Sequence, residues 1–244
     1  MAINAREIIS CGLNNIQSVG NKTFEIRDFI NDNGLDILML TETWLYSYET
    51  AKITEMTPDT HTFHHVPRDN RKGGGVGIFV SNLFTKIKMD KVPKINHFEF
   101  MQVSCEYRGT KLTFVIVYRW PGSSAVSFCE EFRLYFESLE EVGSEIVIGG
   151  DFNFLVDDPE NVTAKNFTEM MEIMGYKNWV NKPTSNSGHT LDLIFGKSNS
   201  DRIQDVNVFN MSAISPVHMP VNFKIRIEIN KAQKKNILFR NKRH

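Results

Sequence analysis

The stretch from 146 to 153, Ile-Val-Ile-Gly-Gly-Asp-Phe-Asn, constrains the fold more than any other part of the chain. Its β-branched start predicts a buried strand, and the two glycines let the backbone approach a neighbour closely. Residues two apart on an extended strand point to the same side, so Asp151 and Asn153 are expected to reach one small object. A carboxylate and an amide suit a hard cation, a phosphate oxygen or an attacking water. The alternative is a tight turn in which both side chains bond their own backbone.

Apolar runs separated by turn residues predict a mixed α/β chain. The first 40 residues indicate a strand, a helix and a second strand, at 7–13, 22–33 and 36–40. The segment 46–59 is expected to be irregular. Further strands are expected at 60–66, 74–80, 85–90, 98–107, 111–118, 189–195, 203–209 and 221–230, and helices at 127–142 and 163–174. We expect one domain of two packed sheets with helices outside.

Composition excludes several classes of protein. The chain has 244 residues, of which 41% are hydrophobic and 23% charged, as in soluble globular proteins. It contains no run of about 20 apolar residues and no apolar signal region at its start, so neither a membrane span nor secretion is expected. Three scattered cysteines favour a reducing compartment.

The last 14 residues contain six of the 28 basic residues and no acid. An acidic body with a basic tail is compatible with a metal site and a polyanionic partner, although a solvated, disordered end has the same composition. We expect a domain at 1–230 and a separate basic tail at 231–244.

Polar residues stand where most of the predicted apolar strands end. They are Asn15, Glu42, Tyr118, Arg119, Asp151, Asn153, Asp192 within a late strand, and His218 before the last strand. In α/β proteins, ligands bind at the edge of the sheet where such polar groups gather. Acids, amides, a tyrosine and a histidine are the set that metal-assisted phosphodiester hydrolysis needs.

The order of these motifs resembles the endonuclease/exonuclease/phosphatase superfamily. The motifs are Asn15, Thr-Glu-Thr-Trp (41–44), Val-Tyr-Arg (117–119), Gly-Asp-Phe-Asn (150–153), Thr-Leu-Asp (190–192) and His-Met-Pro-Val (218–221). Within it, the chain most resembles the apurinic-endonuclease-like domain of LINE-type non-LTR retrotransposons. Two further segments, residues 15–22 and 68–80, also resemble that domain. Gln17 stands where that domain usually has arginine. The resemblance implies a four-layered α/β sandwich, two packed mainly antiparallel β-sheets flanked by helices.

The resemblance also implies roles for individual residues. Glu42 would ligate Mg²⁺, for which Mn²⁺ could substitute, with Asn15 at or next to the ion. Asp151 would orient or activate the attacking water, and Asn153 would hold the scissile phosphate. Tyr118 would contact the phosphate or steady the leaving group.

Asp192 would support the histidine and the metal network, and His218 would bind phosphate or act as a general base. The DNA contacts implied by the basic loop and the other motifs are Arg68, Arg71, Lys72, Arg119 and Thr184. For the loop cations, a solvated surface is the alternative interpretation.

One position departs from the family pattern. The family has Ser-Asp before this histidine, whereas this chain has Pro216 and Val217. An acid beside a catalytic histidine fixes its tautomer and stabilises its charged form. Val217 can do neither, so we expect either an altered or tolerated variant whose histidine is held in another way, or a domain that cleaves weakly or not at all.

The resemblance implies a Mg²⁺-dependent endonuclease that nicks double-stranded DNA and leaves a 3′-hydroxyl for priming reverse transcription. The partner would be a reverse transcriptase domain of the same polyprotein, with the tail as the start of a linker, and the location nuclear. A catalytically impaired DNA-binding domain, and a phosphatase or phosphodiesterase of the same superfamily, are the alternatives. The oligomeric state and the target sequence are not predicted.

Overall fold

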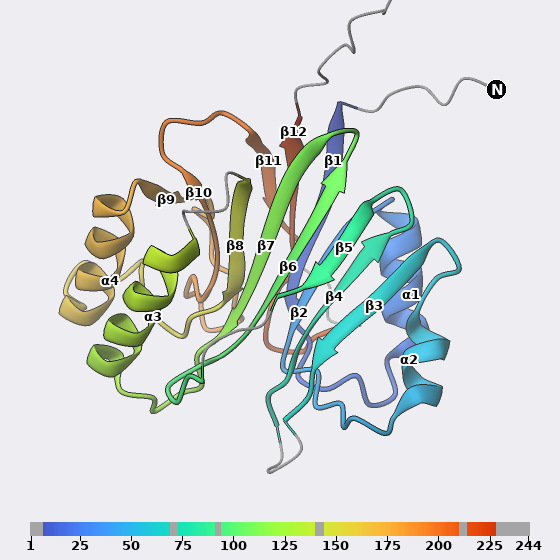
Figure 1. Cartoon of the computed structure of the whole chain (residues 1–244). Helices are drawn as coiled ribbons and strands as arrows, with labels where there is room; N and C mark the ends of the chain where they lie inside the picture. Colours follow the sequence, from blue (N-terminus) through green and yellow to red (C-terminus); the bar gives the residue numbers. More distant parts are fainter. Residues whose placement is uncertain (1–6, 69–72, 91–93, 140–143, 210–213, 228–244) are drawn as a thin grey trace, which may run out of the picture.

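The computed structural model describes residues 7–68, 73–90, 94–139, 144–209 and 214–227, which form four layers (Figure 1). Two six-stranded sheets pack face to face. Helices α1 (Thr23–Asp32) and α2 (Thr50–Met56) cover one sheet, and α3 (Ala125–Leu139) and α4 (Val162–Ile173) cover the other. The predicted four-layered α/β sandwich is confirmed.

The first sheet has the order β11-β12-β1-β2-β4-β3. Its strands are β11 (Ile203–Val208), β12 (Val221–Arg226), β1 (Ile8–Asn15), β2 (Ile37–Thr41), β4 (Val76–Ser81) and β3 (His61–Val66). The second sheet has the order β5-β6-β7-β8-β10-β9. Its strands are β5 (Thr85–Met89), β6 (Glu99–Tyr107), β7 (Thr110–Tyr118), β8 (Glu145–Asp151), β10 (Asp192–Lys197) and β9 (Tyr176–Asn178).

Pairing within the sheets is mainly antiparallel, and each sheet contains one parallel pair. Strands β1 and β2 are parallel and connected through α1, which confirms the predicted strand-helix-strand start. Strands β7 and β8 are parallel and connected through α3. Because parallel strands end at the same edge, each pair delivers two chain segments to one place.

Three apolar clusters hold the layers together: one between the sheets, one rich in aromatic rings between the second sheet and its helices, and one under α1 and α2. The sheets approach closely at Gly149, where an added Cβ would lie 2.6 Å from the Cε of Met39. At Gly150 an added Cβ would lie 1.8 Å from the carbonyl oxygen of Val117 on the neighbouring strand. The predicted close approach at both glycines is confirmed.

Some local predictions were wrong. Helix α2 lies in the segment expected to be irregular, and it buries only Met56, so the sequence there has no apolar stripe. Strand β10 begins at Asp192 rather than at 189, because the preceding residues bond the 182–185 segment instead of a sheet neighbour. Strand β9 was not predicted, since three residues are too few for a periodic signal.

Other predictions fall outside the described residues. The basic tail and two of the predicted DNA contacts, Arg71 and Lys72, belong to these segments. Among the helices that the structure describes, none has the length and apolarity to cross a membrane.

The close approach at Gly150 can be tested by substitution. Gly150→Ala is expected to lower the unfolding free energy by more than about 3 kcal/mol, because the new methyl group meets a backbone carbonyl that cannot move without breaking the sheet. Gly122→Ala is the control, since its φ of +84° is strained but nothing lies within 4 Å. That control should cost about 1–2 kcal/mol. Equal losses in urea unfolding would contradict the packing argument.

Candidate active site

The predicted polar residues gather at one end of both sheets, the lower end in Figure 1. Strands β1, β2, β7 and β8 finish there, and β10 and β12 begin there. The opposite end is where the first and last paired residues, Ile8 and Arg226, lie side by side. The site is therefore built from strand ends that are far apart in sequence.

Strand register in the second sheet places three polar residues in one row. Tyr118 of β7 is paired with Asp151 of β8, which is paired in turn with Asp192 of β10. Residues directly opposite on neighbouring strands project to the same face of a sheet. The register alone therefore brings two carboxylates and a phenol together.

A tight turn follows Asp151. The backbone N–H of Asn153 donates to Oδ1 of Asp151 at 3.0 Å, and the Asn153 side-chain amide donates to Oδ2 at 3.1 Å. Asn153 has a φ of +50°, a conformation that asparagine tolerates better than most residues. The turn that we considered as an alternative to a shared site is thus present, and it places the Asn153 amide against the carboxylate.

The amide of Asn15 bridges two acids from different sheets. Its Nδ2 donates to Oε1 of Glu42 at 2.9 Å and to Oδ2 of Asp151 at 2.8 Å. Its Oδ1 accepts from the backbone N–H of Gln17 at 3.1 Å, which fixes the side-chain orientation. The other carboxylate oxygen of Glu42 accepts from the indole N–H of Trp44 at 3.1 Å. Trp44 stands in one of the predicted motifs, but its hydrogen bond to Glu42 was not predicted.

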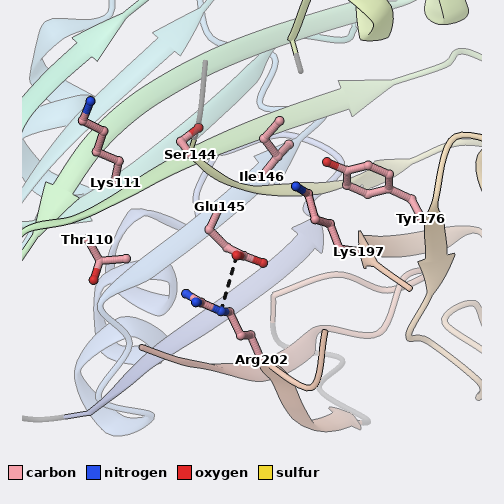
Figure 2. A pocket seen from close by; sticks show the side chains of 8 residues that line it. All are labelled: Thr110, Lys111, Ser144, Glu145, Ile146, Tyr176, Lys197 and Arg202. Atoms are coloured by element: carbon pink, nitrogen blue, oxygen red, sulfur yellow. Dashed lines mark ion pairs between the residues drawn. The ribbon is translucent and has the colours of Figure 1, made fainter. Parts of the chain in front are cut away.

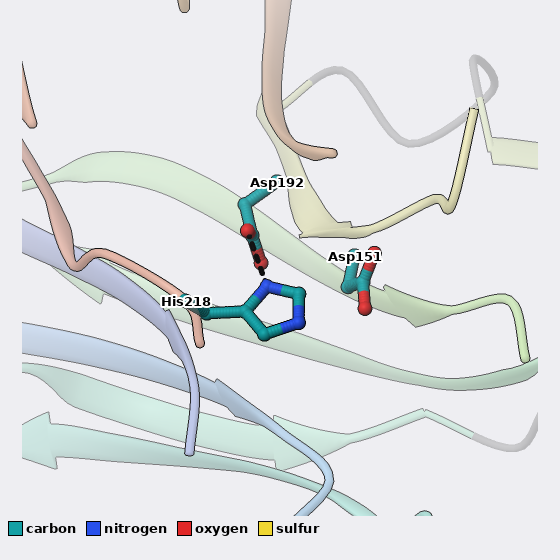
Figure 3. A group of neighbouring side chains, drawn as sticks. All are labelled: Asp151, Asp192 and His218. Carbon is teal, nitrogen blue, oxygen red and sulfur yellow. Dashed lines mark hydrogen bonds and ion pairs between the residues drawn. The ribbon is translucent and has the colours of Figure 1, made fainter. Parts of the chain in front are cut away.

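The histidine is paired with an acid. Nδ1 of His218 lies 2.8 Å from Oδ2 of Asp192, and both side chains are buried. The other ring nitrogen lies on the side of Asp151 (Figure 3). Burial alone would lower the pKa of His218, but the Asp192 carboxylate and the other nearby acids raise it to about 9. His218 is therefore a cation at neutral pH.

His218 is held in another way than by a preceding acid, which is one of the two alternatives expected. Its acid is Asp192, at the start of β10, so the implied support of the histidine by Asp192 agrees with the structure. The backbone N–H of His218 also donates to Oγ of Ser215 at 3.1 Å. Val217 uses its carbonyl to accept from the N–H of Asn186 at 2.9 Å. The histidine is thus held at its ring and at its backbone without an acid at 217.

Two predicted DNA contacts instead support the site from beneath. Thr184 is fully buried, and its hydroxyl accepts from the backbone N–H groups of Leu191 and Asp192, both at 3.0 Å. Arg119 is buried and donates to the carbonyl oxygens of Phe152, Asn153 and Ser123. The structure does not support DNA contacts for these two side chains, because both point into the protein.

Arg68 lies at the edge of the site. Its guanidinium is paired with the Glu99 carboxylate and lies 5.8 Å from the ring centroids of Tyr118 and Trp120. Tyr118 donates its hydroxyl to Glu42, and burial, together with the Glu42 and Asp151 carboxylates, raises the pKa of Tyr118 well above its usual range. Tyr118 therefore remains a protonated hydrogen-bond donor.

The acids fit a divalent cation. Asp151, Asp192 and His218 offer ligand atoms within 4.8 Å of one another (Figure 3). Burial and the Asp192 charge raise the pKa of Asp151 to about 8, and Oδ1 of Asp192 has no hydrogen-bond partner among the described residues. A buried carboxylate oxygen without a donor, close to a second carboxylate, is stabilised by a bound cation. Asp151 and Asp192 are the acids of this cluster that would hold it, and Glu42 is connected to Asp151 through the Asn15 amide.

The arrangement suits cleavage of a phosphate ester. A bound divalent cation supplies charge stabilisation at a phosphoryl oxygen. The His218 imidazolium offers a second positive charge for a phosphate oxygen. A cation bound beside Asp151 would favour its ionised form, which could then accept a proton from an attacking water. The Asn153 amide nitrogen donates to Asp151 and, at 2.6 Å, to the carbonyl oxygen of Arg119, so its Oδ1 is the atom that could orient that water.

A separate cavity of about 360 Å³ lies at the opposite end of the second sheet, where β7 and β8 begin (Figure 2). Lys111, Lys197 and Arg202 line it together with Glu145, whose Oε2 is 3.5 Å from Nε of Arg202. Its lining contains neither a pair of acids nor a histidine. It is not part of the candidate active site.

Comparison with known proteins agrees with this geometry. The model of the endonuclease/exonuclease/phosphatase family matches residues 11–215. No curated protein sequence matches the chain significantly.

Solved structures share the fold at low identity. The endonuclease domain of TRAS1, a telomere-specific non-LTR retrotransposon, superposes with a TM-score of 0.71 and 16% identity over 90% of this chain and 99% of that one. The apurinic endonuclease LMAP from Leishmania major gives 0.72 and 14% identity over 91% and 88%. A 3′ phosphatase from Neisseria, bound to a product DNA hairpin, gives 0.67 and 13% over 89% and 99%.

Asp192→Asn is expected to lower the pKa of His218 from about 9 toward or below its ordinary 6.5, because burial remains while the main opposing charge is lost. NMR titration in EDTA measures the pKa of His218, with His61 as an internal control.

Since folding raises the pKa of His218, its pair with Asp192 stabilises the fold fully below about pH 6.5, and this contribution is lost as the pH rises through about 9. The stability deficit of Asp192→Asn should thus be larger at pH 6 than at pH 9.5. An unchanged His218 titration would refute the pairing.

Proposed function

Because the chain belongs to the endonuclease/exonuclease/phosphatase family, whose members are metal-dependent enzymes that cleave phosphate esters, we propose that it is a Mg²⁺-dependent DNA endonuclease. It nicks one strand of double-stranded DNA and leaves a 3′-hydroxyl that primes reverse transcription. Mn²⁺ substitutes for Mg²⁺ in this proposal.

The observation that carries the proposal is the bridge from Asn15 to Glu42 and Asp151, facing the buried pair of Asp192 and His218. It joins a negative pocket for a hard cation with a positive imidazolium for a phosphate oxygen. Both are needed for attack on a phosphodiester, whose charge rises as the transition state forms.

DNA is favoured over a small phosphate ester by what lies beside the acids. Arg68 is held at the edge of the site by Glu99, Tyr118 and Trp120, where a cation can contact the backbone of a long polyanion. The similarity in fold to a retrotransposon endonuclease domain supports the same choice. We accordingly propose a reverse transcriptase domain as partner, the segment 231–244 as the start of a linker to it, and a nuclear location.

The impaired-domain alternative loses its basis in the structure. It depended on Val217, but His218 has an acidic partner in Asp192 without an acid at 217. A phosphatase remains the competing enzyme, since one similar fold is that of a 3′ phosphatase. Nicking of plasmid DNA, which has no terminal phosphate, distinguishes the two.

Supercoiled plasmid should be nicked in Mg²⁺ and not in EDTA. Glu42→Gln is expected to lower the nicking rate by at least about 100-fold, or about 2.7 kcal/mol, because it removes a charge that would face the cation while keeping the shape of the side chain. Glu25→Gln, an exposed acid on α1, is the matched control. Absence of Mg²⁺-dependent nicking by the unaltered chain would reject the endonuclease proposal.

The substitution Val217→Asp tests whether His218 needs an acid at position 217. We expect nicking to change by less than about tenfold, or about 1.4 kcal/mol, because the ring of His218 is already oriented by Asp192. A rate increase of several hundredfold, measured in the same plasmid assay, would mean that the site does need an acid at 217.

A further inference from the structure

A second cavity, of about 260 Å³, adjoins the candidate active site beside Glu42 and has no role in the chemistry described above. We refer to it as the Trp44 pocket. Its lining includes Ser18, Trp44, Tyr46, Lys52, Arg68 and Gly73. The indole N–H of Trp44, in its wall, donates to Glu42, so the pocket is one hydrogen bond away from the acids.

The floor of the Trp44 pocket is held rigidly by its backbone. The N–H of Ser18 donates to the carbonyl of Glu42 at 2.8 Å, and the N–H of Trp44 donates to the carbonyl of Gly74 at 2.8 Å. Ser18, Glu42 and Trp44 all have positive φ, at 91°, 52° and 54°. Three non-glycine residues in this conformation cost free energy that the surrounding loops must offset, and such strain clusters at ligand sites. The pocket is therefore preformed.

An aromatic platform extends from the rim. The rings of Tyr46 and Tyr48 are stacked, with centroids 5.3 Å apart and an interplanar angle of 9°. Tyr48 is 73% exposed. The Tyr46 N–H donates to the Glu49 carboxylate at 2.9 Å, which anchors the segment where α2 begins. A ring that is fixed from one side and open on the other is a surface on which another flat ring can stack.

Two cations line the pocket, and each is paired with a carboxylate. Lys52 is paired at 2.5 Å with Glu49, which also lines the pocket, and Arg68 is paired with Glu99 on the side toward Tyr118. Aromatic faces alternating with cations are the pattern by which proteins hold nucleic acid strands, since bases stack and phosphates pair with the cations.

We propose that the Trp44 pocket and the Tyr46–Tyr48 platform bind one nucleotide of the DNA strand next to the scissile phosphate. The base stacks on the tyrosine rings, and Arg68 contacts the adjoining phosphate. The inference rests on the proposed endonuclease function for its substrate. It adds a position at which a base outside the cleaved bond contributes to affinity and to choice of site.

Binding and cleavage are measured separately, so that the two proposals fail in distinguishable ways. For binding, a labelled DNA oligonucleotide is titrated in EDTA, where no cleavage takes place, and its anisotropy is followed. Tyr48→Ala should weaken binding about 5- to 150-fold, the range that base stacking on an aromatic side chain gives. Tyr48→Phe keeps the ring and should recover most of the lost affinity. Leu83→Ala removes an exposed apolar side chain outside the pocket lining and is the control.

A series of oligonucleotides, each lacking the base at a different position along the strand, identifies the bound position. At that position, removing the base should weaken binding to the unaltered protein. The same removal should change the affinity of Tyr48→Ala little, because the ring on which the base would stack is already absent. For cleavage, the ratio of plasmid nicking to hydrolysis of bis(p-nitrophenyl) phosphate should fall at least tenfold in Tyr48→Ala, since the small ester does not reach the platform.

Equal affinity of the unaltered chain and Tyr48→Ala for the oligonucleotide overturns the pocket proposal, whether or not the plasmid is nicked. Weakened binding by Tyr48→Ala with no base position that couples to it also overturns the proposal, since stacking would then be absent. If the oligonucleotide binds through Tyr48 but the plasmid is never nicked, the pocket stands and the endonuclease proposal fails.

Discussion

The Asn15 amide is the interaction on which the site depends, because it joins the two sheets where their strands end. Its two hydrogen bonds reach Glu42 after β2 and Asp151 at the end of β8. Without this bridge the two carboxylates, which belong to different layers of the sandwich, would lose the donor that they share. The close contact of Gly149 with Met39 brings the layers near enough for one short side chain to span them.

Charge in the site is balanced across the sheets as well. Asp151 and Asp192 are paired residues on neighbouring strands, and burial, followed by the charge of Asp192, raises the pKa of Asp151. His218 approaches Asp192 from the other sheet and is the counter-charge to it. A divalent ion beside the two acids would favour the ionised form of Asp151, so ion binding and the ionisation of Asp151 are coupled.

The polar residues at the ends of apolar strands could be predicted from the sequence. Glu42 and Asp151 could be identified because each stands at the end of a strongly apolar run. The register of the parallel pairs places Asn15 beside Thr41, which precedes Glu42, and Tyr118 beside Asp151. Arg119 and Thr184 could not be assigned, since a residue type does not reveal whether its side chain turns inward. The support of His218 by Asp192 was implied by the family resemblance alone, because the two residues are 26 apart, with β10 and β11 in that interval, and no local period encodes their contact. Helix α2 was missed because a helix that buries one residue leaves no stripe.

The position of β1 beside β12 has a mechanical consequence. The two strands are antiparallel neighbours, and the ends at Ile8 and Arg226 lie together at the far end from the acids. A pulling force applied between these two ends would load the hydrogen bonds of the pair one after another, as in opening a zipper, rather than all at once in shear. Leu13 and Val221, the pair nearest the catalytic edge, would part last. Molecules tethered to a surface by this end would present the catalytic edge to solution.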